Sequence, residues 1–143
     1  MVEIIEVNKA TDAYLHALNR LLPQLSGSAM PLSMESLESL LQNSSVHLYF
    51  AVEDEEILGT LSLVIFQIPT GIRAWVEDVV VESKARGKGV GRALSLHALS
   101  ESRKHGAQTV DLTSRPSRQS ANHLYQSVGF EKRETNIYRF KNA

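Results

Sequence analysis

Three glycines are interspersed with three cations in a short segment in the middle of the chain. This segment comes shortly after an apolar β-branched run. The run is Val79-Val80-Val81, and the mixed segment is Arg86-Gly87-Lys88-Gly89-Val90-Gly91-Arg92. Glycine lets a backbone turn tightly and approach a ligand without a Cβ in the way. A helix predicted to begin at about Val90 directs its unpaired amides and positive dipole end at whatever lies before it. Together these features predict an anion site, most naturally for phosphate.

Two common phosphate-binding motifs do not fit this segment. A dinucleotide fingerprint requires glycine at positions 87, 89 and 92, and the last of these is Arg92. A nucleoside-triphosphate loop requires Ser or Thr after Gly-Lys, and Lys88 is followed by Gly89. The alternative to an anion site is a glycine-rich turn with incidental surface cations.

Two acidic residues, Glu77 and Asp78, stand immediately before the valine run. A carboxylate at this point could take a proton from an amine. Adjacent strand residues point to opposite faces of a sheet, so only one of the two can serve a given site. A β-bulge would relax that rule. The alternative for Glu77 is a solvent-exposed acid at the strand end, or an ion pair with Arg73.

The hydrophobic pattern predicts the elements that position these residues. Helices are expected after Thr11 (stopped by Pro23), after Ser33, over 90–105 (closed by Gly106) and over 116–128. Strands are expected at 2–7, 46–52, 57–68, 72–82 and 108–113, with one or two more in 130–140. The pattern predicts an α/β (α+β) fold: a mixed, mostly antiparallel sheet of six or seven strands with about four helices on its two faces.

Length and composition limit the possible classes of protein. The 143 residues, 43% hydrophobic and 22% charged, predict one domain over 1–143. The absence of cysteine excludes disulfides and thiolate chemistry, and the five histidines have no metal-ligand spacing, so no metal is expected. The longest uncharged stretch is too short to span a bilayer, and the acidic start does not resemble a secretory signal. We therefore expect a cytoplasmic protein without a membrane partner.

The formal charge is divided unevenly along the chain. Residues 1–72 hold two basic and nine acidic side chains, and residues 73–143 hold thirteen basic and seven acidic ones. This asymmetry favours an anionic ligand on the second half. Nucleic acid is not expected as a partner, because aromatic residues are 6% of the chain and none interleaves the cations of 84–92.

Two segments carry a resemblance to a known family. Arg86-Gly87-Lys88-Gly89-Val90-Gly91 resembles the Arg/Gln-x-x-Gly-x-Gly/Ala motif of the GCN5-related N-acetyltransferases. Asn122-His123-Leu124-Tyr125-Gln126-Ser127-Val128-Gly129-Phe130 resembles the family's Asn- and Tyr-bearing helix that ends in Gly-Phe. The order of predicted elements also matches, so the resemblance covers essentially the whole chain and implies the family's fold.

The resemblance implies acetyl-CoA as cosubstrate, with its pyrophosphate on backbone amides of the glycine segment. It implies that the valine run offers main-chain groups to the pantetheine arm and that Asn122 contacts the same arm. Tyr125 would protonate the departing thiolate, although its spacing is also that of a buried core residue. Glu77 would act as the base through water. The implied cofactor-binding residues are Val79, Val80, Val81, Arg86, Gly87, Lys88, Gly89, Val90, Gly91, Arg92, Asn122 and Tyr125.

The expected reaction is direct transfer of an acetyl group to a primary amine of a small molecule. Acetylation of a peptide N-terminus or lysine, and a non-catalytic acyl-CoA-binding module, are the alternatives. We expect the 22–34 loop, the two N-terminal helices and the final strands to select the acceptor. Glu35, Glu77 and Asp78 would suit a cationic amine, whereas Arg115 and Arg118 would suit an anionic group on the acceptor. The family resemblance also leaves open a homodimer formed through the last strands.

Overall fold

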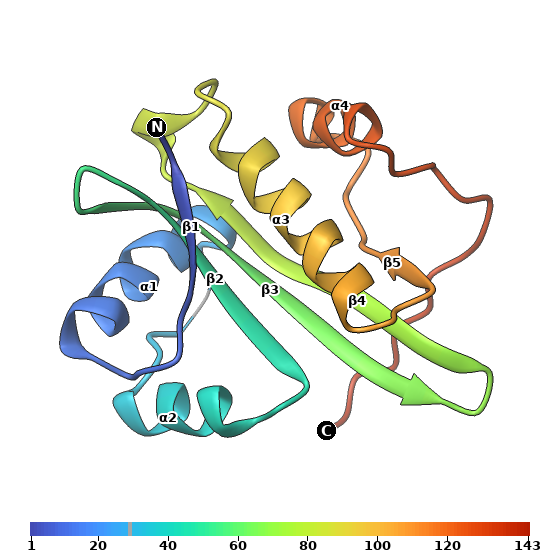
Figure 1. The fold of residues 1–143 in the computed structure, drawn as a ribbon, viewed down its shortest axis with the longest axis horizontal. Coiled ribbons are helices and arrows are strands. Elements are labelled where there is room, and N and C mark those ends of the chain that lie inside the picture. The colour runs from blue at the N-terminus through green and yellow to red at the C-terminus, as the bar shows by residue number, and fades with distance from the viewer. Residues whose placement is uncertain (29) are drawn as a thin grey trace.

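The computed structural model describes residues 1–28 and 30–143, which form one sheet and the helices around it (Figure 1). Within these residues there are five strands, in the spatial order β1-β2-β3-β4-β5. The strands are β1 (Glu3–Glu6), β2 (Val46–Glu53), β3 (Glu56–Ile68), β4 (Gly71–Val81) and β5 (Thr109–Asp111). The helices are α1 (Asp12–Leu25), α2 (Met34–Gln42), α3 (Val90–Lys104) and α4 (Gln119–Ser127), with a 3₁₀ turn η1 (Ser83–Ala85).

The pairing of the strands confirms a mixed, mostly antiparallel sheet. The pairs β1–β2, β2–β3 and β3–β4 are antiparallel, whereas β4 and β5 are parallel. Helix α3 lies between β4 and β5 in the chain, as a parallel connection requires. An acidic turn with left-handed residues Asp54 (φ 51°) and Glu55 (φ 63°) joins β2 to β3.

Alternate residues of the sheet divide the core into two layers. On β2, Tyr49 and Ala51 belong to a buried cluster that includes Leu94 of α3. Leu48 and Phe50 of the same strand belong to a second cluster with residues of α1 and α2. Because side chains alternate along a strand, α3 covers one face and α1 with α2 cover the other. The prediction of helices on both faces is confirmed.

The helix starts predicted after Thr11, after Ser33 and at about Val90 are confirmed, whereas the last helix begins at Gln119 and not at 116, and the stop predicted at Pro23 is wrong. The hydroxyls of Thr11 and Ser33 accept hydrogen bonds of 3.1 Å from Tyr14 N and Ser36 N, so both residues are N-caps. Helix α1 continues through Pro23 to Leu25. Near a helix end, proline removes only one hydrogen bond, the one that its amide would donate to the carbonyl four residues earlier. The helix can therefore continue for two more residues. In the described part of the chain no helix is long and apolar enough to traverse a bilayer.

The prediction of six or seven strands is wrong, because the described residues from 129 to 143 contain no strand or helix. Ile137, Tyr138 and Phe140 are 65%, 88% and 87% exposed. Residues that favour strands form one only where a partner edge is available. The neighbouring β5 has three residues, fewer than the predicted span 108–113, and offers a short edge. Helix α4 is likewise shorter than the predicted 116–128.

Candidate active site

A β-bulge in β4 decides where the two acids before the valine run lie. Ser62 pairs with Glu77 and Thr60 pairs with Val80, so two residues of β4 stand opposite Leu61 alone. One of them, Asp78, has a φ of 51° in the left-handed region. Val76 before the bulge and Val79, its second residue, both contact the core under α3. The bulge therefore leaves Glu77 and Asp78 together on the α1–α2 side of the sheet.

The two acids have different surroundings on that side. Trp75 Nε1 donates a hydrogen bond of 2.6 Å to Glu77 Oε2, and the contact is exposed to solvent. Asp78 instead lines a cavity beneath α1 and α2, together with leucines of both helices. The possibility that a bulge places both acids on one face is confirmed, whereas no sequence pattern predicted the indole contact.

Among the residues that the structure describes, no strand pairs with the second half of β4 on the β5 side. The two strands pair only from Arg73 to Trp75, and the chain after β5 diverges from β4 toward α4 (Figure 1). Glu82 N donates to Leu58 O of β3 at 2.7 Å. Because backbone groups alternate along a strand, the amides of Val81 and Val79 face away from β3, toward this gap, whereas that of Val80 faces β3.

The glycine segment forms an open turn ahead of α3. Gly87 and Gly89 have φ values of 81° and 82°, and Gly89 is the N-cap of the helix. In the described part of the chain, nothing beyond the neighbouring residues lies within 4 Å of the place where a Cβ on either glycine would be, so a ligand can approach the backbone there. The first bond of the helix runs from Ala93 N to Gly89 O at 3.0 Å. The amides of Gly89, Val90, Gly91 and Arg92 precede that bond, so four donors at the start of α3 have no partner within the helix.

The cations of this segment differ in their surroundings, and its third glycine, Gly91, lies at a contact between helices. Lys84, Arg86 and Lys88 are exposed beside the turn. Arg92 Nη1 instead donates to Ser127 Oγ of α4 at 3.2 Å. A Cβ on Gly91 would lie 3.0 Å from Leu124 Cδ2, so this glycine lets α3 approach α4 closely.

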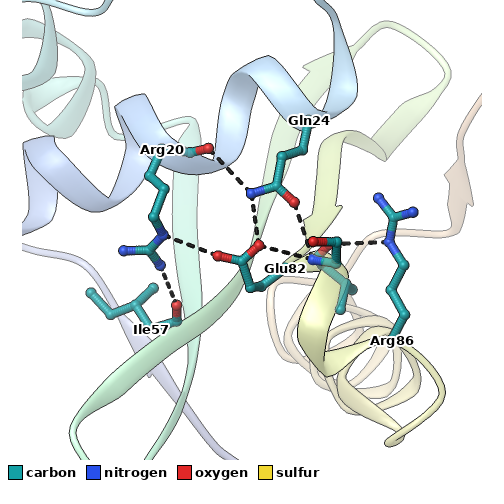
Figure 2. Close-up of polar contacts among 7 residues, drawn as sticks. Arg20, Gln24, Ile57, Glu82 and Arg86 are labelled. Carbon is teal, nitrogen blue, oxygen red and sulfur yellow. Dashed lines mark hydrogen bonds and ion pairs between the residues drawn. The ribbon is translucent and has the colours of Figure 1, made fainter.

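A buried carboxylate anchors the strand end that leads into the turn (Figure 2). Glu82, 8% exposed, accepts hydrogen bonds from Arg20 Nε at 3.2 Å and Gln24 Nε2 at 2.8 Å, both on α1. The carboxylate also accepts from Ser83 N at 2.9 Å. The hydrogen bond from Gln24, followed by those of Ser83 and Arg20, lowers the pKa of Glu82 against the effect of its burial. Arg20 and Gln24 lie about sixty residues from Glu82 in the chain, so no local pattern predicts their contacts with it.

Helix α4 brings Tyr125 and Asn122 to the other side of the gap. The Tyr125 ring meets that of Phe130 edge to face, with centroids 5.8 Å apart, and burial raises the pKa of its phenol. Tyr125 is therefore protonated at neutral pH. Asn122 Nδ2 donates to the carbonyls of Arg115 and Arg118, both at 2.8 Å, so its amide hydrogens hold the turn before α4.

A side chain at the start of α4 also contacts the end of α1. Arg118 Nη2 reaches from the start of α4 to Leu25 O at the end of α1, at 3.2 Å. This contact joins the two sides of the molecule, and sequence analysis did not predict it. Within residues 1–28 and 30–143, no three His, Asp or Glu side chains gather as a metal ion would require.

Solved structures of several acetyltransferases share the fold of this chain. An aminoglycoside acetyltransferase from an uncultured soil metagenomic sample, in complex with sisomicin, is 16% identical at a TM-score of 0.88, covering 99% of this chain and 96% of that chain. Glucosamine-6-phosphate N-acetyltransferase from Arabidopsis thaliana is 19% identical at a TM-score of 0.83, covering 99% of each chain. AAC(6')-Iy, in complex with the bisubstrate analog CoA-S-monomethyl-acetylneamine, is 19% identical at a TM-score of 0.83, covering 100% of this chain and 99% of that chain. At these identities the similarity shows the fold alone.

The sequence itself identifies the family. No curated protein sequence matches the chain significantly. The model of the acetyltransferase (GNAT) family matches residues 13–130, which include β4, the glycine turn and the whole of α4. The predicted resemblance is thereby confirmed, and the chain belongs to the GNAT acetyltransferase family.

Proposed function

We propose that the protein transfers an acetyl group from acetyl-CoA to a primary amine of a small molecule. The observation that carries the proposal is the open turn from Gly87 into α3, where the first four amides, Gly89 to Arg92, have no acceptor within the helix and can bind an anion. Exposed Lys84, Arg86 and Lys88 add positive charge beside it. A pyrophosphate fits this set of donors. The complex of AAC(6')-Iy with a CoA analog is consistent with the same cosubstrate here.

The proposed reaction uses the gap beside β4. The pantetheine arm lies along the free edge at Val79–Val81, and the amide of Val79 donates to the thioester carbonyl oxygen. Amines with a pKa of ~10 are mostly protonated at neutral pH, so a carboxylate, Glu77 or Asp78, takes the first proton through water. The neutral nitrogen attacks the carbonyl carbon, the carbon–sulfur bond breaks, and the second proton of the nitrogen passes through water to the phenolate that Tyr125 becomes on protonating the thiolate. Tyr125, held protonated by burial, gives its proton to the thiolate of CoA.

The cavity beside Asp78 supports a small acceptor over a protein one. It has a volume of about 110 Å³ and lies under α1 and α2. A peptide segment needs an extended groove with room for several side chains, whereas a small amine needs one enclosed pocket. We therefore favour a small-molecule acceptor over a peptide or lysine.

A pair of glycine variants tests the cofactor site. Gly87 and Gly106 have almost the same left-handed backbone, with φ of 81° and 78°, so alanine strains each by about 1–2 kcal/mol. In Gly87→Ala the new Cβ enters the open space before the turn, whereas Gly106 lies at the far end of α3. We expect Gly87→Ala to weaken CoA binding at least tenfold by calorimetry, and Gly106→Ala to leave it within twofold.

Turnover is measured separately, as thiol release from acetyl-CoA with small amines and with peptides. Release with amines supports the proposal. Binding of CoA without release for any amine would identify a non-catalytic acyl-CoA-binding module. Equal weakening by the two alanine variants, or no heat with CoA for the parent protein, would overturn the cofactor site.

A further inference from the structure

The cavity beside Asp78 has an apolar wall and a charged rim. Leu18 and Leu22 of α1 and Leu40 of α2 form its roof, and Leu48 of β2 lies in its floor. The remaining floor includes Ser62 and Asp78. Of the described residues that line the cavity, Asp78 is the only one that carries a charge.

The backbone of the bulge explains how a carboxylate comes to lie against leucines. Asp78 has a φ of 51°, a conformation that Asp and Asn tolerate better than other residues with side chains. Without the extra residue, regular alternation along β4 would direct the side chain of position 78 toward α3. The bulge therefore builds a single negative charge into the mouth of an apolar pocket, one residue before Val79.

Apart from Asp78, the described lining offers two hydroxyls, those of Thr60 and Ser62, and no cation that could bind an anion. The Thr60 hydroxyl, also in the lining, already donates to Tyr49 O at 3.0 Å. Arg20 on the neighbouring α1 is bound to Glu82 and to Ile57 O. Leucine walls cannot pair the hydroxyls of an amino sugar, and burying an unpaired hydroxyl is unfavourable.

We infer that the acceptor is a primary alkylamine whose compact aliphatic group fills the leucine-lined cavity while its ammonium group binds the Asp78 carboxylate. This inference rests on the proposed function and names its substrate class. The cavity volume of about 110 Å³ gives room for a short aliphatic chain. The ammonium group then lies next to the Val79 amide, where the thioester carbonyl is proposed to bind.

A series of amines tests the size and polarity of the acceptor. Thiol release from acetyl-CoA is measured with ethylamine, propylamine, butylamine, hexylamine, putrescine and glucosamine. We expect kcat/KM to rise about fourfold per methylene up to butylamine and then to fall. Putrescine, which would place a second charge against leucines, and glucosamine are expected to be at least tenfold poorer than butylamine.

Two adjacent leucines of α2 provide a matched control for the cavity. Leu40 and Leu41 both pack against the same core cluster, and only Leu40 lines the cavity. Leu40→Ala is expected to move the optimum toward hexylamine, whereas Leu41→Ala leaves the order of amines unchanged. Asp78→Asn preserves the left-handed backbone and is expected to raise KM for butylamine at least tenfold while the Kd for CoA stays within twofold.

The outcomes separate this inference from the proposed function. If CoA binds and glucosamine or a peptide amine releases thiol as well as butylamine does, the acceptor class is wrong and the acetyltransferase proposal stands. The inference is likewise overturned if Leu40→Ala leaves the order of amines unchanged or if Asp78→Asn leaves the KM for butylamine unchanged. In either case the acetyltransferase proposal stands. If CoA does not bind, both proposals fail.

Discussion

At the scale of single residues, the glycines around α3 serve different physical purposes. Gly87 and Gly89 adopt a left-handed backbone and leave open space in front of the turn. Gly91 lies in the helix and allows the close approach of Leu124 from α4. Gly106 closes the C-terminal end with a φ of 78°. The motif Arg86–Gly91 thus combines a ligand-facing turn with a helix-packing contact.

Tyr125 allows a test of proton transfer to the leaving group. Tyr125→Phe removes only the hydroxyl and keeps the ring contact with Phe130, so the fold is preserved. We expect kcat to fall at least tenfold because general-acid assistance is worth about 10²–10⁴ in rate. The Kd for CoA should stay within twofold by calorimetry. An unchanged kcat would return Tyr125 to a structural role.

At the scale of elements, the bulged strand β4 carries most of the site. Its first half pairs with β5, and its second half offers a free edge toward α4. Its end is fixed to α1 through Glu82, which lies just before η1 and the glycine turn. The network in Figure 2 thereby connects the helix beside the acceptor cavity to the turn proposed to bind the cofactor.

The Glu82 network makes stability depend on pH. Its pKa in the folded protein is below the ordinary 4.5, so its contribution is complete above that pH and is lost as the pH falls through the folded value. Glu82→Gln is expected to lower the unfolding free energy by about 1–3 kcal/mol at pH 7, since bonds to a charged acceptor are lost. In urea titrations the difference from the parent should shrink below about pH 4.5.

An exposed acid provides the control for this measurement. Glu38 lies exposed on α2, and Glu38→Gln is expected to change stability by less than about 0.5 kcal/mol at pH 7. A gap between Glu82→Gln and the parent that stays constant from pH 7 into acid would contradict the role of the charge.

The terminal segment after Phe130 provides a second test at this scale. Residues 131–143 are all exposed and form no helix or strand in the described structure. Removing residues 132–143 is therefore expected to change the unfolding free energy by less than about 1 kcal/mol, because little apolar surface is lost from water contact. The change in the unfolding free energy is measured by urea unfolding of the truncated and the parent protein. A loss above about 3 kcal/mol would mean that Ile137, Tyr138 or Phe140 is buried in solution.

At the scale of the whole molecule, the two halves of the chain carry opposite charge. The first 72 residues have a net charge of −7 and the remaining 71 a net charge of +6. The acidic half supplies α1, α2 and most of the cavity beside Asp78, and the basic half supplies the glycine turn and α4. This division favours a cationic acceptor on one side and an anionic cosubstrate on the other.

Salt tests the electrostatic part of cofactor binding. Raising the salt concentration from about 50 to about 500 mM is expected to weaken CoA binding roughly three- to tenfold, because exposed charges are screened. Lys88→Gln should reduce this salt dependence. Arg103→Gln, which removes one exposed charge at the other end of α3, should leave it unchanged. A salt dependence that is equal in the three proteins would show that Lys88 does not act on the cofactor.

Much of this arrangement could be predicted because it depends on neighbours in the chain. The caps Thr11 and Ser33, the closure of α3 at Gly106 and the glycine turn follow from local backbone preferences. Pro23 misled the prediction of a helix end because proline near a terminus removes only one hydrogen bond. The strands expected in 130–140 did not form, since a strand needs a partner and the adjacent β5 is short.

The sequence by itself determined the family, the alternation of the strands and the chemistry available around Val79 and Gly87. Only the tertiary structure decided which acid meets the cavity, because the bulge opposite Leu61 depends on the register between β3 and β4. It also decided that Glu82 is anchored by α1 and that Arg118 reaches Leu25. These contacts join residues far apart in the chain. They depend on how the sheet and helices pack, and no local preference of the backbone encodes that packing.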